Sequence, residues 1–144
     1  MTVAQAISIA VIFVWLGMVL AISFVEAPLK FRAPGVSLQV GLGIGRLVFR
    51  ALNSIEVAFA VVLVVGLAIE RPSWLAVIAG GVAVVTLAAQ LIAVRPALNR
   101  RSDVVLATPP GQAPAGRSRV HYVYVALELV KVIGLIVGGI ALLV

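Results

Sequence analysis

The first 25 residues carry no charged side chain, and this feature constrains the fold more than any other. The run from Ala6 to Val25 is long enough to cross a hydrocarbon layer of about 30 Å as a helix. Three more long apolar segments follow, and the backbone groups of each must be hydrogen-bonded internally in lipid, so each should be helical. We therefore predict an all-α fold, a four-transmembrane-helix bundle that forms a single integral membrane domain over 1–144. The expected helices cover about 4–25, 45–69, 74–98 and 120–143.

The composition excludes several other classes of protein. Of the 144 residues, 63% are hydrophobic and only 11% are charged, whereas about a quarter of a water-soluble domain is charged. The chain has no cysteine, which excludes a disulfide framework, thiolate catalysis and cysteine-ligated metal centres. His121 is the only histidine, so one chain cannot build a histidine metal cluster. We expect no metal site, and we expect His121 to form hydrogen bonds near the membrane interface.

The basic residues predict how the chain is oriented in the membrane. Nine of the eleven lysines and arginines lie in or beside the two connections expected at 26–44 and 99–119. The positive-inside rule makes these loops cytoplasmic and places both termini on the non-cytoplasmic side of the cell (inner) membrane. The charge is spread over two loops that flank the membrane, so the lipid bilayer, and not a nucleic acid, is the expected partner. Four arginines are interpreted as anchors at the interface: Arg46, Arg95, Arg117 and Arg119.

The segment from 26 to 45 permits two interpretations. From Val36 to Gly45, larger apolar residues alternate with polar residues or glycine, which is typical of a strand. A lone strand could not pair its backbone at membrane depth, so we expect a turn at Pro34-Gly35 followed by the start of a glycine-rich helix. A signal peptide is not expected at the N-terminus, because no Lys or Arg precedes the first apolar run.

Small residues recur at spacings that let helices approach closely. Gly41 and Gly45 are four residues apart, and so are Gly134 and Gly138 in the last span; this spacing is typical of close helix–helix contacts in membranes. Four helices of this length enclose little volume, so we expect a homo-oligomer. Whether these glycine faces pack within one subunit or between subunits stays open.

Two of the four spans carry polar and charged side chains at helical spacing. A charged group on the lipid-facing side of a span costs roughly 2.5–3.5 kcal/mol even on the lenient insertion scale, so such residues usually mark a functional site. Spacings of three and four residues place each set on one helix face. We expect the two faces to meet, with Glu56 near Lys131, and to be joined by Glu26, Thr86 or Gln90. The candidate ligand-binding residues are Arg50, Asn53, Glu56, His121, Tyr124, Glu128 and Lys131.

These faces are compatible with more than one class of function. The first hypothesis is a protein that binds or transports a polar or ionic small molecule through a buried charged layer. The second is a structural or assembly subunit, in which the charges specify pairing with a partner helix. The outer half of the expected bundle is entirely apolar, which argues against a simple aqueous channel. The residues assign no catalytic group, so the pattern leaves open whether the chain is an enzyme.

Most of the chain resembles a family of small bacterial four-helix membrane proteins of unknown function. The similarity lies in the segment that follows the first span, the start of the second span, the Arg95-Pro96 segment and the charged part of the last span. That family is distantly similar to a eukaryotic transmembrane family. The resemblance implies a fold but no catalytic motif. The matching blocks cover 23–31, 43–49, 95–98 and 121–131.

A shorter segment in the second span resembles a different family. It reads Phe49-Arg50-Ala51-Leu52-Asn53-Ser54-Ile55-Glu56. It is similar to the second-helix signature of the membrane-associated eicosanoid and glutathione metabolism family, four-helix proteins that usually form trimers. The resemblance implies a glutathione-dependent membrane enzyme acting on lipophilic substrates, with glutathione bound by Arg50, Asn53 and Glu56 at a subunit interface. Arg119 and Tyr122 loosely match two further positions of that family. No other cofactor is implied.

Overall fold

The computed structural model describes residues 1–112 and 118–144 and contains four long helical rods. Each rod is long and apolar enough to cross a membrane, which confirms the predicted all-α, four-span architecture. Arg117 and the middle of the expected loop at 99–119 lie outside the described residues. The elements are α1 (Val3–Val19), η1 (Leu20–Glu26), α2 (Ala27–Leu29), η2 (Lys30–Arg32), α3 (Leu38–Glu70), α4 (Trp74–Ala89), η3 (Gln90–Val94), α5 (Arg95–Ala107) and α6 (Arg119–Leu143).

A hydroxyl side chain begins every rod. In each case it accepts a hydrogen bond from the backbone N–H three residues later, which satisfies one of the donors left free at a helix N-terminus. The four capping residues are Thr2, Ser37, Ser73 and Ser118. The helices therefore begin where the local sequence supplies a cap, not where the hydrophobic run begins.

The first connection is shorter than the loop predicted over 26–44. Helical structure continues to Arg32, and α3 begins at Leu38, so only 33–37 links the first two rods. The expected turn at Pro34-Gly35 followed by a glycine-rich helix is confirmed, and Gly35 has a positive φ of 78°. The loop boundary was wrong because the Ser37 cap starts the helix seven residues before the apolar run at Gly45.

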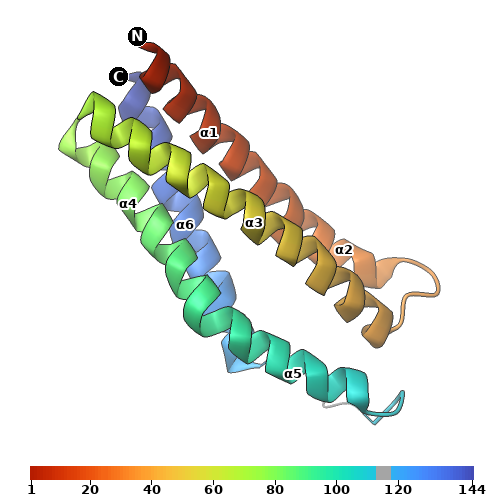
Figure 1. Ribbon diagram of the computed structural model, residues 1–144. Helices are drawn as coiled ribbons and strands as arrows, with labels where there is room; N and C mark the ends of the chain where they lie inside the picture. Colours follow the sequence, from red (N-terminus) through yellow and green to blue (C-terminus); the bar gives the residue numbers. More distant parts are fainter. Residues whose placement is uncertain (113–117) are drawn as a thin grey trace.

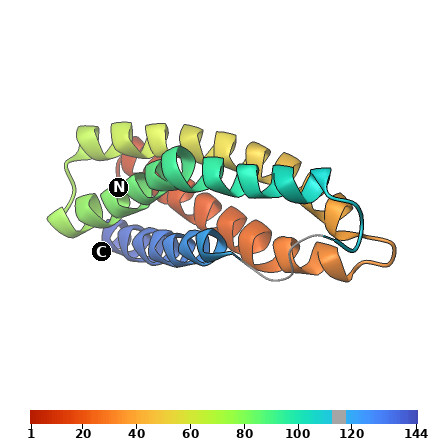
Figure 2. The ribbon, with the colours of Figure 1, turned by 90° about the horizontal axis from the view of Figure 1, so that it is seen from below.

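The rods form an up-and-down bundle with both termini at the same end (Figure 1). α6 packs against α1 and α4, and α3 packs mainly against α1. In the perpendicular view, α3 and α6 lie on opposite sides of the bundle (Figure 2). Side chains of these two helices can therefore meet only across its centre.

Two of the rods contain a π-helical turn just before a proline. η1 ends at Glu26, two residues before Pro28, and η3 ends at Val94, two residues before Pro96. A proline has no N–H to donate and crowds the carbonyl of the preceding turn, so the helix adjusts there by widening or bending. Beyond η3 the rod turns away from α6, and α5 runs alongside the first part of α3 (Figures 1 and 2).

Glycines on α6 let its backbone approach the backbone of α4 closely. A Cβ added to Gly134 would lie 2.9 Å from the Ala79 carbonyl oxygen of α4, and one added to Gly138 would lie 3.4 Å from the Gly80 nitrogen. The paired glycines of the last span thus pack within one chain. Gly41, at the start of α3, faces the Phe31 ring in the same way. This close packing brings the polar groups of different rods within hydrogen-bonding reach.

We expect Gly134→Ala to destabilise the bundle by about 1–3 kcal/mol, because the added methyl group meets backbone that cannot move aside. Gly81→Ala is the matched control, since a Cβ there meets nothing within 4 Å. Thermal unfolding in one detergent would compare the two variants. Equal stability of both would contradict the close α4–α6 contact.

Candidate functional site

A buried network of charged side chains lies at the centre of the bundle. Lys131, on α6, has no exposed side-chain surface. Its Nζ lies 2.5 Å from Glu56 Oε1 on α3 and 2.9 Å from Glu128 Oε2 on its own helix. It also donates to Gln90 Oε1 at 2.9 Å. One ammonium group therefore joins two carboxylates and an amide from three rods.

The remaining rod, which begins with α1, completes the coordination of the two carboxylates. Trp15 Nε1 donates to Glu56 Oε1 at 2.9 Å, and Ser23 Oγ donates to Glu128 Oε1 at 2.8 Å. Glu128 Oε2 also accepts from Gln90 Nε2 at 2.6 Å. Ser23 lies in η1 and Gln90 begins η3, so each π-helical turn supplies one polar group to Glu128. Every rod thus contributes to the network.

The network is closed except at one atom. Glu56, Glu128 and Lys131 are each at most 1% exposed, and burying a charge is costly unless it is paired and hydrogen-bonded. Among the network atoms that the structure describes, Glu56 Oε2 is the buried oxygen without a hydrogen-bond partner. The interior around these groups is therefore already filled with protein contacts.

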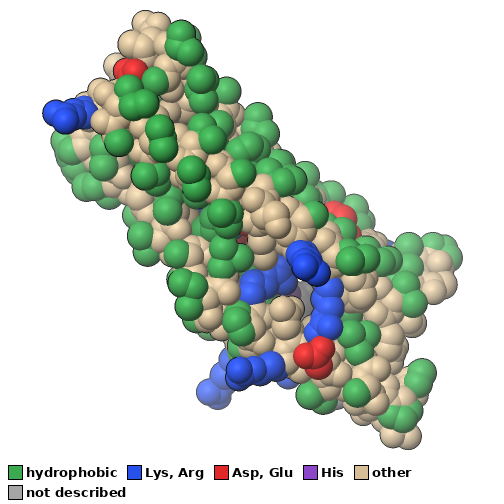
Figure 3. All heavy atoms as spheres, viewed as in Figure 1, with side chains coloured by type: hydrophobic (Ala, Val, Ile, Leu, Met, Phe, Trp, Pro, Cys, Tyr) green, Lys and Arg blue, Asp and Glu red, His purple; other side chains and the backbone are tan. Residues whose placement is uncertain are grey.

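A second polar cluster surrounds an open pocket between α3 and α5. Lys and Arg side chains gather around a hollow on this face of the molecule (Figure 3). The pocket has a volume of about 600 Å³. Its lining residues are Arg46, Arg50, Asn53, Ser54, Val57, Leu91, Arg95, Asn99 and Asp103.

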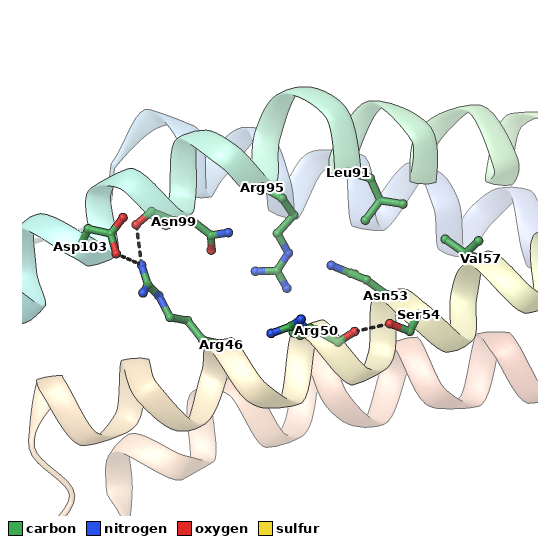
Figure 4. A pocket seen from close by; sticks show the side chains of 9 residues that line it. All are labelled: Arg46, Arg50, Asn53, Ser54, Val57, Leu91, Arg95, Asn99 and Asp103. Carbon is green, nitrogen blue, oxygen red and sulfur yellow. Dashed lines mark hydrogen bonds and ion pairs between the residues drawn. The ribbon is translucent and has the colours of Figure 1, made fainter.

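The pocket carries more positive charge than its own carboxylate can neutralise. Arg46 Nη2 contacts Asp103 Oδ1 at 2.5 Å and the Asn99 carbonyl oxygen at 2.6 Å. No carboxylate of the described residues forms an ion pair with Arg50 or Arg95. Arg95 extends from its helix toward α3, and Asn53 points toward it from the opposite wall (Figure 4). Two N–H groups of Arg95, Nε and Nη2, are buried without a hydrogen-bond partner among the described residues.

Arg95 lies between this pocket and the buried network. Its guanidinium carbon is 4.4 Å from the centre of the Phe49 ring and 5.4 Å from that of Tyr124. Both distances are within the range of a cation–π contact. The Tyr124 hydroxyl in turn donates to Glu128 Oε1 at 3.4 Å. The two rings, which meet edge to face, hold the guanidinium at the inner wall of the pocket.

Six of the seven predicted residues lie in one of these two places. Four belong to the buried network or touch it: Glu56, Tyr124, Glu128 and Lys131. Arg50 and Asn53 line the pocket instead. His121 lies near the start of α6 with its ring edge-on to Tyr122. The expectation that Glu56 meets Lys131 is confirmed, whereas the role of any of these residues in binding stays a prediction.

Helix geometry explains why the residues predicted to share one face of the second span lie on two different sides of α3. At about 100° per residue, Arg50 and Glu56 point in directions that differ by about 120° around α3. Glu56 reaches the bundle centre, while Arg50 is exposed on the side facing α5. Of the additional candidates, Gln90 joins the network, but Thr86 donates to the Val82 carbonyl of its own helix, and Glu26 pairs with Lys30.

Several residues of both clusters were not anticipated. Trp15 and Ser23 come from a span without charges, although Ser8, Ile12, Trp15 and Val19 follow one another at spacings of four, three and four on the buried stripe of α1. A tryptophan on such a stripe brings a buried N–H that needs an acceptor. Arg46 and Arg95 were interpreted as interface anchors, but they line the pocket together with Asn99 and Asp103.

Comparison with known proteins gives no match, whether with protein-family models, curated proteins or solved structures. Both family resemblances drawn from the sequence therefore stay predictions. The motif similar to the glutathione family is also divided in space, because Arg50 and Asn53 line the pocket while Glu56 is bonded to Lys131 and Trp15. Arg119 and Tyr122 are exposed at the start of α6.

We expect Lys131→Met to destabilise the protein by about 3–5 kcal/mol, since it leaves two buried carboxylates without their cation. The triple variant that adds Glu56→Gln and Glu128→Gln removes those charges too and should recover much of the loss. Unfolding midpoints in one detergent would measure both. If Lys131→Met were as stable as the parent protein, the network would not be what stabilises the bundle.

The two carboxylates should respond differently to conversion into amides. In Glu56→Gln, the amide nitrogen can occupy the place of Oε2, which accepts no hydrogen bond, so the bonds from Lys131 and Trp15 are kept. In Glu128→Gln, the amide nitrogen must face either Ser23 or the Lys131 and Gln90 donors. Facing Ser23, the amide nitrogen takes the acceptor away from the Ser23 and Tyr124 hydroxyl hydrogens, and facing Lys131 and Gln90 it places a donor against donors. Either arrangement leaves buried groups unsatisfied, so Glu128→Gln should cost about 1–3 kcal/mol more. Equal losses of unfolding free energy would disprove this assignment of bonds.

Proposed function

We propose that this four-span membrane protein binds an anionic small molecule or an anionic head group in the pocket between α3 and α5. The observation that carries the proposal is the convergence of Arg46, Arg50 and Arg95 on one cavity that contains a single carboxylate, Asp103. Arg46 is already paired with Asp103. Arg50 and Arg95 are therefore the groups that a ligand would neutralise.

The chemistry of the unpartnered groups favours an oxyanion as the ligand. A guanidinium presents several N–H donors in a fixed plane and binds carboxylate or phosphate oxygens through charge-assisted hydrogen bonds. The buried Nε and Nη2 groups of Arg95 lack acceptors within the described part of the chain. An oxyanion placed between Arg50, Arg95 and the Asn53 amide would supply them. Stacking on Phe49 and Tyr124 keeps the Arg95 guanidinium in place for such a contact.

The bundle interior supports binding in preference to conduction. Between the network and the end that holds the termini, the buried core is formed mainly by apolar residues such as Ile12, Leu63, Leu135 and Leu142. A polar path across the bundle would have to cross this region, where the hydration shell of an ion has no replacement. Glu56, Glu128 and Lys131 line neither of the two described cavities.

We assign the buried network a structural role within this proposal. Its bonds tie all four rods together, and Tyr124 connects it to the wall of the pocket through the contact with Arg95. In this proposal, the buried network acts as the structural ion pair and the pocket acts as the ligand-binding site. The side of the membrane on which the pocket opens follows from the positive-inside rule, which predicts the cytoplasmic side.

The proposal is tested with inorganic phosphate as the probe. A ligand that binds only the folded state stabilises it by RT ln(1 + L/Kd), where L is the free ligand concentration, so the unfolding temperature rises with ligand concentration and the rise reports the affinity. We expect phosphate to stabilise the purified protein in a neutral detergent. We expect Arg50→Gln and Arg95→Gln each to weaken the apparent affinity for phosphate about tenfold, which corresponds to the loss of one charge-assisted contact.

Glutathione, which carries two carboxylates, is tested in parallel. A glutathione effect that exceeds that of phosphate and depends on Arg50 would favour the enzyme alternative.

The matched control is Arg32→Gln, which removes one charge from the exposed end of the first rod and not from the pocket. It should leave the phosphate effect unchanged. If all three variants weaken phosphate binding equally, the effect comes from the overall charge of the protein. If none does, the pocket does not bind anions, and the proposal fails.

A further inference from the structure

An apolar groove continues the arginine-lined pocket along the outside of the bundle. It has a volume of about 330 Å³ and runs between α3 and α4. It shares Val57 and Leu91 with the pocket, so the two cavities adjoin, one lined by basic residues and the other by apolar residues. Valine, alanine and leucine make up its whole lining.

The groove results from the way α3 and α4 diverge. Near the turn that connects them they are in close contact, because a Cβ on Gly80 would lie 3.0 Å from Leu67 and 3.6 Å from Leu63. Farther from the turn the two helices separate toward α5 (Figure 1). Small side chains at Ala60 and Ala88 line the gap and do not fill it.

Resting on the proposed function, we infer that the ligand is an anionic phospholipid whose phosphate lies among Arg50, Arg95 and Asn53 and whose acyl chain follows the groove. The charge of the pocket and the apolar lining of the groove match the two ends of such a molecule. Basic pockets between transmembrane helices are a known setting for anionic lipid head groups.

The groove is long enough to hold part of an acyl chain. From Val57 to Val65, α3 rises about 12 Å, and the groove lining over this length is apolar. Val61, Val64 and Val65 are exposed on this side, so the groove opens toward the lipid. A phospholipid could therefore enter sideways from the bilayer, with its acyl chain in the groove and its phosphate among the arginines of the pocket.

The test compares two lipids with identical acyl chains. The protein is incubated in a neutral detergent with equimolar dioleoyl-phosphatidylglycerol and dioleoyl-phosphatidylcholine, and bound lipid is identified by native mass spectrometry. We expect retention of the anionic lipid over the zwitterionic one, and loss of that preference in Arg95→Gln. Ala88→Phe, which fills the groove, should lower retention of the anionic lipid about tenfold while its stabilisation by inorganic phosphate stays unchanged.

Ala58→Phe is the matched control, because Ala58 is exposed on α3 but lines neither cavity. It should retain the lipid like the parent protein. If Ala88→Phe still retains the anionic lipid, or if the parent protein retains the two lipids equally, the inference is overturned. The proposed function would still stand in that case, provided that phosphate stabilises the parent protein. If the parent protein shows neither stabilisation by phosphate nor a preference for the anionic lipid, the proposed function and the inference both fail. A lipid-free dimer that Ala88→Phe dissociates would show that a second copy of this chain occupies the groove, and this too would overturn the inference.

Discussion

A lysine charge inside a membrane bundle has to be neutralised by neighbouring groups, and the packing of this protein depends on how that is done. Lys131 is fully buried at the centre of the bundle, and its ammonium group contacts Glu56, Glu128 and Gln90. Because α3 and α6 lie diagonally, the ion pair crosses the core and sets the rotation of both helices. Trp15 and Ser23 add the donors that the two carboxylates still need.

The π-helical turns in two of the rods serve the network and the pocket together. Each π-helical turn ends two residues before a proline and brings one polar side chain, Ser23 or Gln90, to Glu128. Beyond η3, α5 runs alongside α3 and carries Arg95, Asn99 and Asp103 to the side of a basic pocket that faces α3. The closed interior and the open pocket are therefore consequences of the same departure from regular helix geometry.

The sequence indicated which residues carry the chemistry more reliably than it indicated which of them meet. Intramembrane charge singled out Glu56, Glu128 and Lys131, and all three lie in the network. The same argument placed Arg50 with them, although six residues of helix separate its direction from that of Glu56 by about 120°. A face defined by spacings of three and four is wide enough to contact two different neighbours, so periodicity alone could not distinguish the core from the pocket.

By itself the sequence determined the class of this protein: a hydrophobic content of 63% and four long apolar runs require membrane-spanning helices, because lipid offers the backbone no other hydrogen-bond partner. The hydroxyl residues Thr2, Ser37, Ser73 and Ser118 determined where those helices begin. Only the tertiary structure decided that Trp15 bonds Glu56, that Arg95 contacts the Phe49 and Tyr124 rings and that α3 and α4 leave a groove. Those outcomes depend on distances between residues far apart in the chain, which helix packing and the bend before Pro96 set and which no local pattern encodes.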